Sequence, residues 1–264
     1  MAFATSFFGA RIRLAGCLAL LAGINQALGD APAAETEFAA RAERSFQEAQ
    51  ARYQEAANDA TKAWQFGRAC FELAEYATNH TQRASLAEKG IKLCRLAVVR
   101  ETNSAPAHYY LGMNLGQLAR TKGLGALRLV DQMEREFLRA RALDEHIDCA
   151  GPDRHLGQLY HNAPVFGSVG SRTRAREHLK RAVELAPLYP ENRLDLVEAY
   201  MSWGERTSAH RELQALEANW AAARTTFVGE SWAANWADWE PRLEKLRKKI
   251  EEPAKPLATP REKQ

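Results

Sequence analysis

In the second half of the chain, small and large apolar side chains recur every three or four positions, the spacing that places them on one face of a helix. Ala175, Leu179 and Ala182 begin this pattern, which starts again 34 residues later at Ala209. Small residues let two helix axes approach closely, and large residues fill the groove beside them. Pro187 ends the first helix because its ring cannot continue the helical hydrogen bonding. The pattern therefore predicts antiparallel helix pairs repeated along an all-α chain.

Two further apolar stripes lie near the chain ends. The first runs in steps of three and four from Phe38 to Ala56, and the second from Trp232 to Ile250. A helical solenoid needs end helices with a polar outer side, so both stripes indicate capping helices. A docking surface is the alternative for the tryptophan-rich stripe, because aromatic residues are frequent in interface hot spots. The predicted division is an N-terminal capping helix at 30–59, about four irregular hairpins at 60–217 and C-terminal capping helices at 218–251.

This arrangement resembles the tetratricopeptide repeat (TPR) family, whose unit is a pair of antiparallel helices. The first helices of two units carry the Leu and Gly of the family pattern, and one of them also carries its Tyr. These residues are Leu111, Gly112, Leu156, Gly157 and Tyr160. Second-helix positions of the pattern are held by Cys94, Ala97, Phe137 and Ala140. The resemblance implies a helical-hairpin (TPR-like) solenoid with a capping helix at each end.

The N-terminus has the pattern of a secretory signal. Basic residues, of which Arg13 is the last, precede an apolar run at 14–24, and the small residue Gly29 follows where cleavage is expected. The run is too short to span a bilayer. We therefore expect residues 1–29 to be a signal peptide and the mature chain to be exported, periplasmic or envelope-associated, with no integral membrane segment. The alternatives are a buried helix and lipidation at Cys17, although the apolar stretch follows this cysteine instead of preceding it.

Two expected turns hold extra residues, at 121–126 and 162–173, and glycines mark both as loops. Long loops often carry specificity, although insertions are also tolerated without a function. Val165 and Phe166 favour a loop that packs against the body. With the export signal, this stretch is also similar to bacterial periplasmic repeat proteins that include the T component of tripartite (TRAP) transporters. That similarity implies a TatT-like accessory role.

Composition and charge fit a globular protein without a nucleic-acid partner. Hydrophobic residues make up 46% and charged residues 26% of the 264 residues. The formal net charge of +3 becomes nearly neutral without the two arginines of the signal, so we expect no basic surface for nucleic acid. Membrane-surface binding gains no support from this balance either. The Pro- and Lys-rich stretch at 252–264 is expected to be a disordered tail.

Candidate chemistry is sparse. Cys70, Cys94 and Cys149 remain after the signal, and either a Cys70–Cys94 bridge or buried free thiols would fit neighbouring helices. His155 and His161 lie six residues apart, on different faces of a helix, which argues against a zinc site. The sequence contains no HExxH, GxSxG or Gly-rich phosphate loop. We therefore expect neither an enzyme nor a bound metal or cofactor.

Binding is the class of function that remains. The TPR resemblance implies that the first helix of each hairpin lines the concave side, where side chains not used for packing meet a partner. The residues expected there are Tyr109, Met113, Gln117, Arg154, Gln158, His161, Leu194, Glu198 and Met201. Their character suits an apolar peptide, a helix or a small ligand, and mutual packing is the alternative. We expect an exported scaffold that binds a protein or peptide partner, or alternatively a ligand-binding accessory component of a transporter.

Overall fold

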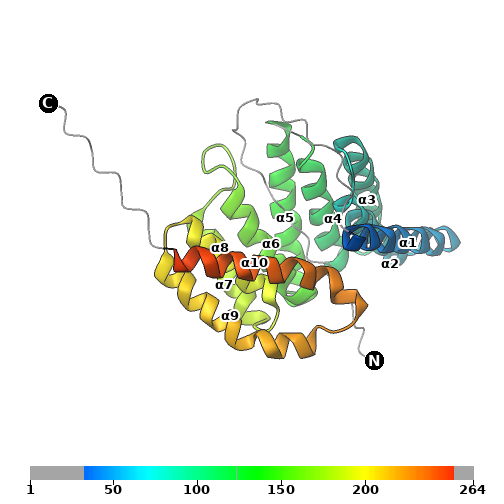
Figure 1. The fold of residues 1–264 in the computed structure, drawn as a ribbon. Coiled ribbons are helices and arrows are strands. Elements are labelled where there is room, and N and C mark those ends of the chain that lie inside the picture. Colours follow the sequence, from blue (N-terminus) through cyan, green and yellow to red (C-terminus); the bar gives the residue numbers. More distant parts are fainter. Residues whose placement is uncertain (1–32, 123, 253–264) are drawn as a thin grey trace, which may run out of the picture.

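The computed structural model describes residues 33–122 and 124–252, and every regular element in these ranges is helical (Figure 1). The longer helices are α1 (Ala33–Glu55), α2 (Ala60–Glu75), α3 (His80–Arg100), α4 (Ala105–Ala119), α5 (Leu127–Leu143), α6 (Ile147–Asn162), α7 (Arg172–Leu185), α8 (Pro190–Ser202), α9 (Arg206–Thr226) and α10 (Ala233–Glu251). Two short 3-10 helices are η1 (Leu124–Ala126) and η2 (Glu230–Trp232). The predicted signal peptide at 1–29 and all but the first residue of the predicted tail at 252–264 lie outside the described residues.

The helices form a row of antiparallel hairpins. The pairs α2–α3, α4–α5, α6–α7 and α8–α9 pack together, and each first helix also contacts the next one along the row. At the ends of the row, α1 packs on α2, and α10 packs on α8 and α9 (Figure 1). The predicted all-α, helical-hairpin solenoid is therefore confirmed.

Short polar side chains and prolines set where helices begin. Asp59 and Asn79 each accept a hydrogen bond from the backbone N–H three residues on, at 3.0 Å and 2.8 Å. Each such cap stabilises its helix by about 1 kcal/mol. Pro106 and Pro190 stand in the first turns of α4 and α8, where the missing N–H would have no helical partner in any case.

The Leu-Gly pairs of the first helices act through the glycine. A Cβ atom at Gly112 would lie 2.6 Å from the ring of Phe137, and one at Gly157 would lie 2.6 Å from Leu179. The two helices of a hairpin thus approach so closely at these points that only glycine fits. The small residues of the repeat pattern have the same role, and Ala175 is fully buried as the pattern predicts.

One side-chain contact links the two ends of the row. Arg41 on α1 donates hydrogen bonds to the backbone carbonyl and the carboxylate of Glu230, at the start of η2. Trp236 and Trp239 of α10 are buried among other aromatic rings, so this part of the tryptophan-rich stripe belongs to the core. The fourth hairpin continues past the predicted boundary at residue 217, because α9 runs on through this position.

The loop between α6 and α7 differs from the expectation. Val165 and Phe166 are 68% and 95% exposed, so the prediction that these two side chains pack against the body is wrong. Gly167, with a φ of 77°, turns the chain beyond them, and Val169 is the loop residue that packs against the core. The hydrophobic character of the two residues could not indicate which of the loop's side chains would face inward.

The cysteines of the second and third helices are free. Cys70 and Cys94 are both buried and form no disulfide. Of the two expectations for this pair, a bridge or buried free thiols, the structure has the free thiols. Burial raises the pKa of Cys70 to about 12 and that of Cys94 well above its ordinary value. Because the thiolate is the reactive form, the raised pKa values and the burial favour a packing role for both residues.

Candidate binding surfaces

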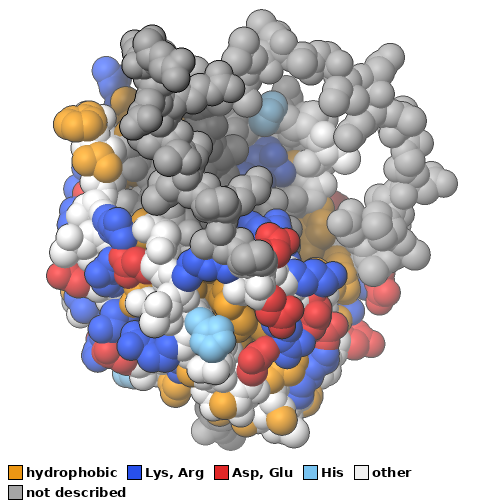
Figure 2. Space-filling model, turned by 60° about the vertical axis from the view of Figure 1, so that its left-hand side comes forward, with side chains coloured by type: hydrophobic (Ala, Val, Ile, Leu, Met, Phe, Trp, Pro, Cys, Tyr) orange, Lys and Arg blue, Asp and Glu red, His pale blue; other side chains and the backbone are white. Residues whose placement is uncertain are grey.

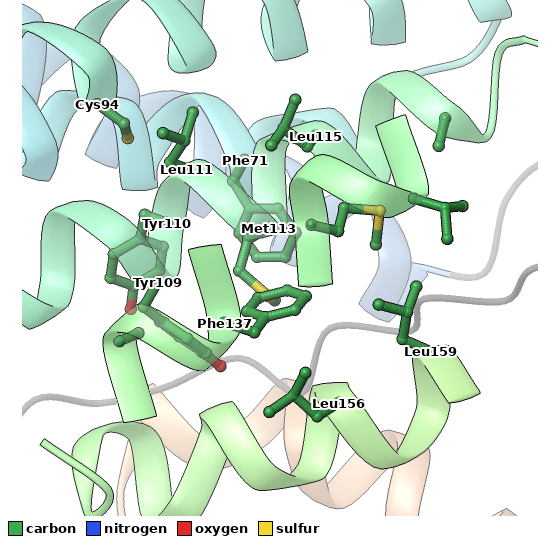
Figure 3. Packing of buried hydrophobic residues seen from close by; sticks show 14 of the residues in the cluster. Phe71, Cys94, Tyr109, Tyr110, Leu111, Met113, Leu115, Phe137, Leu156 and Leu159 are labelled. Atoms are coloured by element: carbon green, nitrogen blue, oxygen red, sulfur yellow. The ribbon is translucent and has the colours of Figure 1, made fainter. Parts of the chain in front are cut away.

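The predicted concave-side residues divide into a buried and an accessible set. The buried set is Tyr109, Met113, Gln117, Arg154 and Leu194. For α4 the reason is its place in the row, because it packs against both neighbouring first helices and both second helices beside it. Figure 3 shows Tyr109 and Met113 among the core side chains. The expectation that these five residues line an open surface is therefore corrected, and their observed role is to hold the hairpins together.

Arg154 is the centre of a buried polar network that joins α4, α6 and α8. Its Nη2 donates to the Oδ2 atom of Asp148 at 2.7 Å, and the hydroxyl of Tyr109 donates to the same carboxylate oxygen. Its Nη1 donates to the side-chain oxygen of Asn192 at 3.0 Å. Burial raises the pKa of Asp148, while the charge of Arg154 and the Tyr109 hydrogen bond oppose that rise. Removing the arginine would leave the carboxylate buried without its charge partner.

The same network supports a strained turn at the start of α6. Asp148, Cys149 and Ala150 have φ angles of 52°, 52° and 65°, in the left-handed region that favours glycine. Arg154 donates to the backbone carbonyls of Asp148 and Cys149 at 3.1 Å and 3.2 Å, and Asn192 donates to that of Cys149 at 3.0 Å. These hydrogen bonds offset the conformational cost of the turn. The sequence gives no signal for it, because none of the three residues is glycine.

Four predicted residues remain at least partly accessible, on α6 and α8. They are Gln158, His161, Glu198 and Met201. Gln158 donates to Asp195 of α8 at 2.5 Å, and Glu198 accepts two hydrogen bonds from Arg242 of α10, each at 3.0 Å. Burial raises the pKa of Asp195 to about 7, while the charge of Arg242 opposes the rise. The structure thus places these four residues on neighbouring helices, and their contact with a partner stays a prediction.

A first groove, of about 420 Å³, lies between α1 and α2. The ring of Trp64 on its wall stacks on Tyr110, with ring centroids 5.9 Å apart. Beside it, Arg68 donates to Glu72 at 2.6 Å. The other residues of this α1–α2 groove are Ser45, Ala49, Arg52, Gln65 and Ala69. The lining therefore combines one aromatic ring with paired charges and small side chains.

A second groove, of about 520 Å³, lies between α3 and α5 with α4 as its floor. Its apolar lining is Ile91, Leu96, Val99, Leu115, Leu118 and Leu129. Its polar lining is Glu88, Lys92, Arg95 and Gln132, of which Arg95 donates to Gln132 across the groove at 3.0 Å. The repeat pattern did not indicate this α3–α5 groove, because in that pattern the second helices serve packing alone. The signal in the sequence that could have indicated the groove is a set of leucines that the family pattern does not require, namely Leu96, Leu118 and Leu129.

Among the described residues, the charged side chains and the possible metal ligands form no further candidate site. On the face in Figure 2, Lys and Arg side chains are interspersed with Asp and Glu side chains. Across residues 33–122 and 124–252, no three His, Cys, Asp or Glu side chains are grouped so that they could hold a metal ion. His155 stacks on the ring of Phe137 in the core, with centroids 5.6 Å apart. In the same ranges, no helix has the length and apolar character needed to cross a bilayer.

Comparison with known proteins identifies the architecture. No protein-family model matches the chain, and no curated protein matches it. The crystal structure of TTC0263, a thermophilic TPR protein in Thermus thermophilus, matches with a TM-score of 0.54 and 17% identity, covering 82% of this chain and 92% of that chain. The chain has a tetratricopeptide-repeat fold. In this TPR fold, α2 to α9 supply the hairpins, and α1 and α10 cover the two ends.

Two structures of MamA also match the chain. Their TM-scores are 0.49 and 0.48, with identities of 16% and 15%. The matches cover 75% and 74% of this chain, and 98% and 95% of the MamA chains.

Proposed function

We propose that this chain is an exported TPR-like scaffold that binds a protein or peptide partner in the periplasm or cell envelope. The α3–α5 groove is the observation that carries the proposal. It is an open apolar depression of about 520 Å³ on a folded surface, and its wall residue Val99 is 78% exposed. Apolar surface of this kind is stabilised when a partner covers it. The role proposed is binding and not catalysis.

The groove suits a helical peptide segment with an apolar stripe. Its α3 wall extends from Glu88 to Val99, which corresponds to about 16 Å or three turns of helix. Aliphatic side chains at i, i+3 or i+4, and i+7 of a bound helix would meet the leucines of this groove. Lys92 and Arg95 stand on the same wall and would attract acidic residues that flank the stripe.

Photocrosslinking in living cells tests this surface. A benzoylphenylalanine at Val99 should form an adduct of one discrete mass with the partner, and Lys92→Glu in the same chain should weaken it. The matched control is benzoylphenylalanine at Val228, which is 61% exposed in the segment after α9. The proposal fails if Val99 yields no adduct, or if both positions yield the same adducts.

Export is supported by the basic and apolar pattern of residues 1–29. Alkaline phosphatase fused after Gly29 folds to its active form only outside the cytoplasm, where its disulfides form. We expect an active fusion, and we expect Leu20→Arg with Leu21→Arg to abolish its activity by interrupting the apolar run. An inactive fusion with the unaltered segment would contradict export.

A ligand-binding accessory component of a transporter is the second candidate. It is favoured by the α1–α2 groove, whose volume of about 420 Å³ falls in the usual range of small-molecule sites. Native mass spectrometry should then detect a small molecule on the purified protein, and Trp64→Ala should remove it. The mass of the polypeptide alone would contradict this candidate and leave the scaffold proposal intact.

A further inference from the structure

The tip of the loop between α6 and α7 carries the most exposed large hydrophobic side chain of the described residues. Phe166 is 95% exposed, and its neighbours Pro164, Val165 and Gly167 are exposed as well. This loop, yellow-green in Figure 1, leaves the body of the molecule between the two helices. Four consecutive residues without a polar side chain thus meet solvent, which is unfavourable unless an apolar environment receives them.

The base of this loop is held in place. The N–H of Gly170 donates to the carbonyl of Pro164 at 3.1 Å, and the N–H of Ser171 donates to the carbonyl of Tyr160 at 2.9 Å. Val169, the residue before Gly170, packs against the core. A Cβ atom at Gly170 would collide with the backbone at the start of the same loop. The exposure of the tip is therefore a consequence of how the loop is anchored.

Three arginines follow the loop directly, at the start of α7. Glu205 pairs with both Arg172 and Arg176, and Glu134 pairs with Arg174 at 2.8 Å, so three guanidinium groups share two carboxylates. The first turn of α7 contains no acidic residue. The N-terminal end of the helix dipole adds further positive potential at this place. The apolar tip therefore stands next to the basic first turn of α7, which carries Arg172 and Arg174, while the exposed Glu177 in the second turn offsets Arg176.

Aromatic rings support the arginines in this position. The guanidinium of Arg174 lies 3.8 Å from the ring centre of Tyr160. Those of Arg172 and Arg176 each lie 5.3 Å from a ring centre of Trp203. With these cation–π contacts and their ion pairs formed, the side chains of Arg172, Arg174 and Arg176 remain 51%, 43% and 39% exposed, so phosphate oxygens can reach them.

We propose that this loop is a contact site for an anionic lipid surface. Phe166 and Val165 enter the boundary between head groups and acyl chains, while the arginines of α7 meet the phosphate groups. The order of an apolar tip and a basic base matches the order of these layers in a bilayer. A lipid boundary also accepts an apolar tip without a complementary shape. The near-neutral net charge gave no indication of this site, because a net charge does not show where arginines are clustered. The inference does not rest on the α3–α5 groove.

Vesicle flotation of the purified full chain tests the proposal. We expect wild-type protein to float with vesicles that contain phosphatidylglycerol. The partition coefficient of Phe166→Ala should be lower by about tenfold or more. Val228→Ala is the control, because it removes an exposed hydrophobic side chain from another loop and should bind as the wild type does. Binding should fall with added salt and should be weaker to vesicles of phosphatidylcholine alone.

A fluorophore on the loop reports insertion independently of total binding. An environment-sensitive dye on Phe166→Cys should shift to the blue when the anionic vesicles are added, and the same dye on Val228→Cys should not. Both variants share the free cysteines Cys70, Cys94 and Cys149, so background labelling is matched. Wild-type protein that does not float, Phe166→Ala that floats equally, or equal binding to phosphatidylcholine would each overturn the proposal.

Discussion

On the first-helix side of the array a buried polar network joins the helices, whereas the second-helix side holds an open apolar groove. On the first side, Arg154, Asp148 and Tyr109 are buried because each has a partner from another helix. On the second side, Leu118 and Val99 line a gap that no helix of the described residues fills. Burial here follows from the presence of partners on other helices more than from side-chain polarity. A polar residue with such partners can be core, and an apolar residue without neighbours can be surface.

Arg154→Ala should produce the largest loss of stability. It leaves Asp148 buried without its charge partner and removes the hydrogen bonds that hold the strained turn, so we expect a loss of about 3–5 kcal/mol in the free energy of unfolding. Urea denaturation followed by circular dichroism measures this change. Arg128→Ala, at an exposed position on α5, is the control and should lie within about 0.5 kcal/mol of the wild type. An equal effect of both substitutions would mean that the buried network contributes little.

Gly112→Ala tests the close contact within a hairpin. The added methyl group would lie 2.6 Å from Phe137, so the helices must shift, and we expect a loss of about 1–3 kcal/mol. Gly125→Ala is the matched control, because a Cβ atom there meets only Lys122, at 3.8 Å. Thermal unfolding of the two variants gives the comparison. If Gly112→Ala were as stable as the control, the close approach of α4 and α5 would be in doubt.

The pH dependence of stability tests the contact of α10 with α8. Burial raises the folded-state pKa of Asp195 to about 7, above an unfolded value of about 3.9. Between these values the folded protein binds more protons than the unfolded chain, so this residue lowers stability as the pH rises from about 4 to about 7. Asp195→Asn should remove that contribution, and urea titrations across this range should show it. The exposed Asp131→Asn is the control, and identical pH profiles for both variants would contradict the assignment.

Val99→Glu should have the smallest effect on stability and a large effect on binding. Val99 is 78% exposed, so the substitution should change the free energy of unfolding by less than about 0.5 kcal/mol. The new carboxylate should weaken capture of a partner by the α3–α5 groove, because an apolar stripe would have to desolvate it. Denaturation and photocrosslinking from a second groove position, Leu129, measure the two effects. Unchanged crosslinking would remove Val99 from the binding surface.

The repeat pattern predicted the architecture because it depends on contacts close in sequence. Ala175 and Leu179 meet the preceding helix through a spacing that any hairpin array requires, and both are buried as expected. The surfaces were harder to predict because they depend on distant partners. Tyr109 finds its acceptor in Asp148, 39 residues away, on a turn whose left-handed backbone no glycine marks. The exposure of Phe166 is decided by Val169, which occupies the inward position of the same loop.

We propose that partners bind on the second-helix side. The most direct test is photocrosslinking in living cells with benzoylphenylalanine at one of two positions in otherwise identical chains. One position is Val99 on the α3–α5 groove, and the other is Glu198 on the first-helix side. Both positions are exposed, so their reactivity toward a bound partner can be compared. We predict a discrete partner adduct from Val99 and none from Glu198. An adduct from Glu198 alone would contradict the claim and restore the first-helix side as the binding surface.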